Sequence, residues 1–224
     1  MKERSILVNG IIIAIVGLIC VSFYRYLRPD KQSALDDRIL DSLGLTIVLF
    51  GQYVRISARG YKSARHFDTS VLVTDGPYAF VRHPMYLGSF LIGLGIVILL
   101  LKLWLVPFYL VFFLLWYRPQ IHNEEQWLLR KFGQEYIDYC ETTPCFFPRM
   151  SKLFGFKAKT YIPIKLAWVK KEWNTILVWS LVVVIVEGYE DISSYTFQVF
   201  VGELVFLLLI VLYFTAFVVL FSEN

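Results

Sequence analysis

Long apolar blocks separated by polar connections are the dominant pattern along the chain. Four blocks have the roughly 17–25 residues that a helix needs to cross a bilayer. They cover residues 5–24, 39–57, 86–103 and 198–221. Two more, 104–121 and 173–188, are shorter or less clean. Apolar residues gathered in blocks, without the period of an amphipathic helix or strand, are typical of spanning helices. We expect an all-α, polytopic transmembrane helical bundle of about six spans, with five as the alternative.

Basic residues gather in the two longest polar connections, and this sets the expected orientation. Cytosolic connections carry an excess of Lys and Arg. Segments 58–85 and 118–172 are rich in both, whereas the connection between the last two spans contains acidic residues and no basic one. The connection 25–38 is an exception, because it is basic yet is placed outside. We therefore expect a multi-pass protein with a polar site on its cytoplasmic face.

The composition agrees with a membrane protein. Hydrophobic residues make up 57% of the chain and charged residues 18%, whereas soluble domains are about half apolar and a quarter charged. The three cysteines lack the spacing of a disulfide framework or a zinc knuckle, so free thiols are expected. We predict one membrane domain over residues 1–224, with the lipid bilayer, and no nucleic acid, as its partner.

A polar motif, GPYAFVRHPMYLG at residues 76–88, leads into the third apolar block. Pro84 suits the first turn of a helix, where no backbone donor is lost. Arg82 and His83 then stand just before a helix N-terminus, and such a position attracts a carboxylate or phosphate. The alternative is structural: Arg82 as an interfacial anchor, His83 as a cap and Gly88 as a close helix contact.

A second polar segment, residues 122–140, follows the fourth block and is predicted to be helical, with a break at Gly133. It contains the adjacent carboxylates Glu124 and Glu125. Neighbours on a helix point about 100° apart, so one of them can face a pocket while the other faces a nearby arginine. The alternative is a pair of charges at a helix start that interacts with the helix dipole.

Metal chemistry is not expected. The chain has three histidines, His66, His83 and His122, and none falls in the i, i+3 or i, i+4 pairs of a helical metal box. A glycine loop of the nucleotide-binding type and a serine-centred elbow are also missing from the sequence. These patterns argue against a di-iron membrane hydroxylase and a serine hydrolase.

The two polar segments together resemble the isoprenylcysteine carboxyl methyltransferase and phospholipid methyltransferase superfamily. The shared elements are Gly-Pro-Tyr, Arg-His-Pro-x-Tyr-x-Gly, Glu-Glu and Phe-Gly-x-x-Tyr-x-x-Tyr, in this order. The likeness covers about residues 45–150, so the helical pair at about 173–221 is an addition to the family-like core. The basic stretch 59–72 has no confident counterpart in the family.

The resemblance implies a site for S-adenosylmethionine between the start of the third span and the segment after the fourth. The cofactor-binding residues implied by it are Tyr78, Arg82, His83, Pro84, Tyr86, Gly88, Glu124 and Glu125. It also implies a lipid-borne or lipidated methyl acceptor that enters from the membrane.

The acceptor itself stays open, with the carboxylate of an isoprenylcysteine-like group favoured. A carboxylate needs a cation to orient it, for which Arg118, Arg55 and Arg59 are candidates. An amine would need a base such as Glu124, Glu125 or His122, and a thiol lies between these cases. We assign Arg118 and Glu125 as candidate catalytic residues.

Two other functions remain as alternatives. His-Pro-x-Tyr-Leu-Gly and the later Phe-Gly motif are also similar to NADPH-dependent sterol reductases, which are longer and have more spans. A non-catalytic membrane protein on the same fold is the other alternative. Binding of adenosylhomocysteine rather than NADPH would separate the first alternative from a methyltransferase.

Overall fold

The computed structural model describes residues 34–65, 71–101, 103–149 and 161–194. Every regular element within these ranges is a helix, so the all-α prediction is confirmed for them. The elements are α2 (Ala34–Arg65), α3 (Pro77–Phe80), α4 (Pro84–Leu101), η1 (Leu103–Leu105), α5 (Val106–Phe132), α6 (Gln134–Thr142), α9 (Leu166–Val169), η2 (Lys170–Glu172) and α10 (Trp173–Ser194).

The predicted spans relate to these helices in different ways. Block 39–57 lies within α2, and block 173–188 lies within α10. Across the described ranges, no helix is both long enough and apolar enough to cross a membrane. The predicted spans 5–24 and 198–221 lie outside the described residues. The six-span topology stays a prediction.

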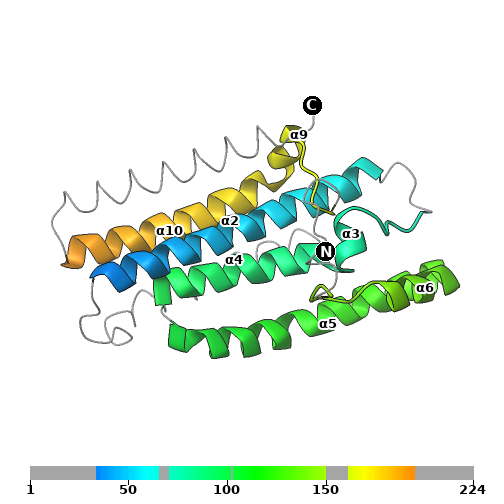
Figure 1. Cartoon of the computed structure of the whole chain (residues 1–224), viewed down its shortest axis with the longest axis horizontal. Coiled ribbons are helices and arrows are strands. Elements are labelled where there is room, and N and C mark those ends of the chain that lie inside the picture. Colours follow the sequence, from blue (N-terminus) through cyan, green and yellow to red (C-terminus); the bar gives the residue numbers. More distant parts are fainter. Residues whose placement is uncertain (1–33, 66–70, 102, 150–160, 195–224) are drawn as a thin grey trace, which may run out of the picture.

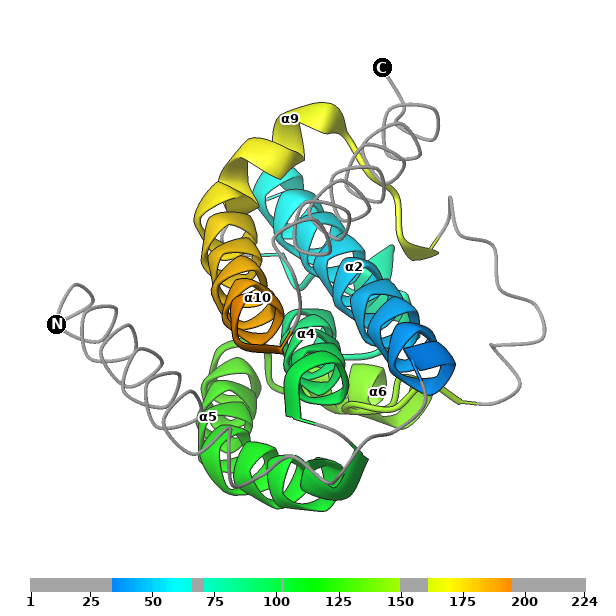
Figure 2. The same cartoon turned by 90° about the vertical axis from the view of Figure 1, so that its left-hand side faces the viewer.

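Four long helices form the body of the structure, with neighbours running in opposite directions (Figure 1). Helices α2 and α4 are antiparallel, and α5 lies along the other side of α4 (Figures 1 and 2). Helix α10 adds to the same core, since Trp179 and Val183 are buried with Leu45 and Val48 of α2. Helix α4 is therefore the central element.

Two glycines allow α2 and α4 to approach closely. A Cβ atom at Gly51 would lie 2.8 Å from the carbonyl oxygen of Gly88 and 2.8 Å from the backbone nitrogen of Ile92. Backbone atoms cannot move aside as a flexible side chain can. Gly88 is thus a helix-packing residue, as the structural alternative for this motif predicted.

The start of α4 agrees with the sequence, whereas the boundary predicted between blocks 104–121 and 122–140 does not. Helix α4 begins at Pro84, the predicted first-turn position. Blocks 104–121 and 122–140 were expected as separate elements, but α5 runs without a break from Val106 to Phe132. Glu124 and Glu125 are consequently inside a long helix. Their interpretation as a helix-start charge pair is wrong, because the apolar block and the polar segment share one continuous backbone.

The predicted break at Gly133 is confirmed. The residue has a φ of +54°, a backbone conformation that glycine adopts without strain, and it separates α5 from α6. Tyr136 and Tyr139 of α6 are buried together with Leu72. This packing fixes α6 against the segment that precedes α3.

Candidate cofactor pocket

An ionic cluster joins the first turn of α4 to α5. The Arg82 Nε and Nη2 atoms donate to Glu125 Oε1 at 3.2 and 2.7 Å. The remaining nitrogen, Nη1, donates to the carbonyl oxygens of Cys140 and Thr143, each at 3.2 Å. Each of the three guanidinium nitrogens therefore has a partner, and the arginine ties α4, α5 and α6 together.

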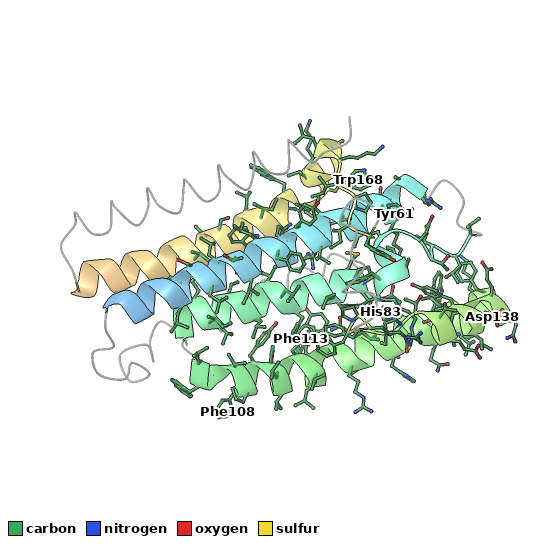
Figure 3. The ribbon with its side chains drawn as sticks, viewed as in Figure 1. Tyr61, His83, Phe108, Phe113, Asp138 and Trp168 are labelled. Carbon is green, nitrogen blue, oxygen red and sulfur yellow. The ribbon has the colours of Figure 1, made fainter. Side chains whose placement is uncertain are left out.

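His83 shares the same carboxylate. Its Nε2 atom lies 3.3 Å from Glu125 Oε1, and its Nδ1 atom lies 3.7 Å from Glu124 Oε2. The side chain is buried, with 3% of its surface exposed. His83 also caps α4, because its carbonyl oxygen accepts a hydrogen bond from the Leu87 N–H. Figure 3 shows His83 between the start of α4 and α5.

These contacts shift the pKa of both partners in the directions of an ion pair. Burial lowers the pKa of His83, but hydrogen bonds with Cys145 and Glu125 and the charge of Glu124 outweigh it and raise the pKa to about 9. The hydrogen bond from His83, opposed by burial and assisted by Arg82, lowers the pKa of Glu125 to about 2. At neutral pH the imidazole is therefore protonated and the carboxylate ionised.

Backbone hydrogen bonds with the segment after α6 hold the motif in place. The N–H groups of Arg82 and His83 donate to the carbonyl oxygens of Pro144 and Cys145 at 2.9 and 3.2 Å. The Tyr139 hydroxyl donates to the carbonyl oxygen of Tyr78 at 2.6 Å. These bonds satisfy backbone groups that precede the helix and would otherwise need water.

A polar pocket of about 320 Å³ opens beside this cluster. Its lining combines cationic, anionic and aromatic side chains. The residues are Arg55, Lys62, Tyr78, Arg82, His83, Pro84, Met85, Tyr86, Ser89, Tyr117 and Glu124. Such a lining suits a zwitterionic ligand with an aromatic part, since it offers both signs of charge and π faces.

The two adjacent glutamates point in different directions and make different contacts, as expected for neighbours on a helix. Glu124 lines the pocket and lies 3.7 Å from Lys62. Glu125 is absent from the lining and holds Arg82 and His83 from the other side. Among the described residues Glu124 is the one carboxylate in the pocket wall, so it is placed to meet a cationic group of a ligand.

A second ionic cluster supports the opposite wall. Arg55 of α2 lines the pocket and donates to the hydroxyl of Ser89. Its Nε atom also donates to Glu172 Oε2 at 3.1 Å, and Arg59 Nη1 donates to Glu172 Oε1 at 2.8 Å. Burial raises the pKa of Glu172, but the two arginines outweigh it and hold the pKa below its usual range.

An apolar pocket of about 380 Å³ lies on the other side of the motif. It shares Pro84 with the polar pocket. Aromatic and aliphatic side chains and prolines form its wall. The residues are Phe50, Val54, Pro77, Phe80, Val81, Pro84, Leu87, Phe90, Leu91, Phe147, Pro148, Tyr161 and Ile162. Its chemistry suits a hydrocarbon chain.

Residues 44–130 match the model of the isoprenylcysteine carboxyl methyltransferase family. The protein-S-isoprenylcysteine O-methyltransferase of Tribolium castaneum is 34% identical over 112 residues, covering 45% of this chain and 38% of that protein. A nickel-cobalt-cadmium resistance protein of Alcaligenes xylosoxydans xylosoxydans is 36% identical over 109 residues, covering 49% and 48%. The predicted resemblance to this superfamily is confirmed.

A solved structure of the eukaryotic intramembrane Ras methyltransferase, an isoprenylcysteine carboxyl methyltransferase, also aligns with the chain. The TM-score is 0.49 and the identity 25%, covering 66% of this chain and 53% of that one. The chain spans between about two fifths and half of the length of the curated relatives that it matches.

The structure brings most of the predicted site residues together. Tyr78, Arg82, His83, Pro84, Tyr86 and Glu124 line the polar pocket. Gly88 does not, because it packs against Gly51 and Arg55 of α2. Arg118 lies exposed on α5 and is also absent from the lining. Arg55, one of the other cation candidates, takes the place expected for Arg118.

Four other residues of the pocket lining were not predicted. Lys62, Ser89 and Tyr117 line the pocket but lie outside the family motifs, and Met85 occupies a variable position within one of them. Ser89 directly follows the last motif residue, and Tyr117 precedes the polar segment, so sequence position is a weak signal for both. Nothing in the sequence marked Glu172 as a site residue, because a glutamate after two lysines is typical of a solvated connector.

One group in the described part of the chain has the donors of a metal site. Ligand atoms of His83, Glu125 and Cys145 lie within 4.8 Å of one another, and imidazole, carboxylate and thiolate suit zinc-like ions. The Glu125 oxygen near His83, however, accepts two hydrogen bonds from Arg82. A metal ion there would lie beside a guanidinium. The expectation of no metal stays a prediction.

Proposed function

We propose that the chain is an integral membrane methyltransferase that transfers a methyl group from S-adenosylmethionine to a lipid-borne acceptor, most directly the carboxylate of a prenylated cysteine. The observation that carries this proposal is the pair of pockets that share Pro84, one ionic and one apolar. A polar methyl donor and an acceptor with a hydrocarbon tail need two such environments side by side. The names of the curated relatives support the same reaction class.

The polar pocket fits the methyl donor group by group. S-adenosylmethionine supplies an electrophilic methyl on a positively charged sulfur. Glu124 is placed for a cationic amine, and Arg55 and Lys62 are placed for a carboxylate. Tyr86 and Tyr117, with ring centroids 5.5 Å apart, offer π faces that attract a cation.

The chain's own residues then have separable tasks. Arg82, His83 and Glu125 hold the start of α4 against α5 and so fix the pocket wall. A carboxylate acceptor is ionised at neutral pH and needs no base. It needs alignment and the exclusion of water. Arg55 is placed to orient either this carboxylate or that of the methyl donor, since its guanidinium is at the pocket wall and Arg118 is not.

The proposed location is a bilayer, with the polar pocket at its cytoplasmic face. The predicted spans and the positive-inside bias support it. So does the run of exposed apolar side chains along α5, which includes Phe108, Phe112 and Leu115; Phe108 projects away from the body in Figure 3. The test is extraction with alkaline carbonate, in which an integral protein stays with the membrane fraction.

The reaction is tested by incubating the purified chain with methyl-labelled S-adenosylmethionine and a lipid extract that contains prenylated cysteine. We expect label in the lipid fraction that is released as methanol by mild base, because methyl esters hydrolyse and N-methyl and S-methyl groups do not. Base-stable label would point to an amine or thiol acceptor. Binding of NADPH, with no binding of adenosylhomocysteine and no transfer, would overturn the proposal.

A further inference from the structure

Glu172 is a fully buried carboxylate that forms ion pairs with two arginines of α2. Its side chain is 0% exposed, whereas the side chains of Arg55 and Arg59 are 17% and 48% exposed. Oε2 accepts from Arg55 Nε at 3.1 Å, and Oε1 lies 3.5 Å from Arg55 Nη2. This is a bidentate contact, which fixes the plane of a guanidinium as well as its position.

The third nitrogen of Arg55 points elsewhere. Nη1 contacts the hydroxyl of Ser89, and both Arg55 and Ser89 line the polar pocket. Arg59 also contacts Glu172 but is absent from the pocket lining. Glu172 therefore restrains one edge of the Arg55 guanidinium while the other edge is at the pocket wall.

The segment that carries Glu172 is clamped onto α2. Tyr53 donates to the carbonyl oxygen of Ile162 at 3.2 Å, and Ser57 donates to that of Pro163 at 2.6 Å. Trp168 is buried against Gly60, where a Cβ atom would lie 2.1 Å from the indole ring. Every one of these anchors on α2 is near Arg55 in sequence, so the segment has little freedom to move Glu172.

We propose that Glu172 is a positioning residue that presents the Arg55 guanidinium to a ligand carboxylate in the polar pocket. This inference rests on the proposed function, and it adds a residue from outside the family-matched region 44–130. The carboxylate belongs either to the acceptor or to the amino-acid part of the methyl donor. Without Glu172, Arg55 keeps its charge but loses its fixed orientation.

The test is equilibrium binding of matched acid and amide ligands to the purified full chain. One pair is a prenylcysteine and its carboxamide, and the other is adenosylhomocysteine and its carboxamide. We expect wild type to prefer one of the two acids by about tenfold or more, as one charge-assisted hydrogen bond would give. The pair that shows the preference identifies the source of the carboxylate.

Glu172→Gln should abolish that preference, and so should Arg55→Gln. Arg59→Gln is the matched control, because it removes an ion pair with the same carboxylate but leaves Arg55 held, so the preference should persist. If Glu172→Gln does not fold, the double variant Arg59→Gln/Glu172→Gln leaves one arginine fewer without a counter-charge and serves in its place.

Two outcomes would overturn the inference. In the first, the acid preference survives in Glu172→Gln and is lost in Arg55→Gln, so that Glu172 only neutralises charge. In the second, wild type shows no preference for either acid, so that Arg55 binds no carboxylate. If wild type still transfers methyl groups at an ordinary rate in that second case, the proposed function stands. Failure of the inference about Glu172 is thereby distinguished from failure of the proposed function.

Discussion

At the scale of single residues, the link between Arg82 and Glu125 determines whether the pocket wall forms. Glu125 Oε1 accepts two hydrogen bonds from Arg82 and lies 3.3 Å from His83 Nε2. One oxygen atom therefore gathers two cationic side chains from the motif. Removing its charge leaves both of them buried beside a neutral amide, a costly arrangement.

Glu125→Gln should weaken adenosylhomocysteine binding by about tenfold to a hundredfold, the cost of losing charged hydrogen bonds. Isothermal titration of the purified protein measures it. Glu135→Gln is the control, because this glutamate is exposed on α6. Equal affinities for wild type and Glu125→Gln would remove the carboxylate from the pocket's support.

Protonation of His83 predicts how stability depends on pH. Its pKa rises from 6.5 to about 9 on folding, so its stabilisation is complete below pH 6.5 and is lost as the pH rises through 9. The pKa of Glu125 falls from 4.5 to about 2, so its stabilisation is complete above pH 4.5 and is lost as the pH falls through 2.

The wild-type melting temperature in detergent should therefore decline between about pH 7 and pH 9.5, with a loss of up to about 3 kcal/mol. His83→Gln should show a clearly shallower decline over the same range, because the variant has no imidazole to deprotonate. Parallel melting curves for the two proteins would contradict the ion pair.

At the scale of elements, the contact between α2 and α4 depends on the absence of side chains. Gly51→Val should destabilise the protein by about 1–3 kcal/mol or more, because the added atoms meet the backbone of Gly88 and Ile92. Thermal unfolding measures the change. Leu43→Val, at a half-exposed position of α2, is the control and should unfold close to wild type.

Sequence motifs predicted the pocket wall formed by α5 and the start of α4 better than the wall formed by α2. Arg82, His83 and Glu124 were found because they stand in short polar motifs that border apolar blocks of the sequence. Arg55 and Glu172 meet only after α2 and the segment before α10 have packed, and no local pattern records that contact. The helix boundary predicted between residues 121 and 122 was wrong for a related reason, since polarity changes along α5 without breaking it.

At the scale of the whole molecule, two pockets of opposite character meet at one proline. In the proposed function the apolar one holds the hydrocarbon tail of the acceptor. Leu91 lines the apolar pocket only.

Leu91→Trp should raise the KM for acceptors with long prenyl chains by about tenfold, and it should affect acceptors with short chains less. The affinity for adenosylhomocysteine should stay within about twofold of wild type, since Leu91 does not line its proposed pocket. These magnitudes follow from the area of chain excluded. A uniform rise in KM for all chain lengths would place the tail elsewhere.

The contact between Glu172 and Arg55 also limits how the protein can be divided. The family-matched residues 44–130 contain both arginines but not their shared carboxylate. A chimera that transplants only this region into a relative would carry two arginines without their counter-charge. The region is a unit of sequence similarity rather than an autonomous catalytic module, and exchangeable pieces should extend through residue 172.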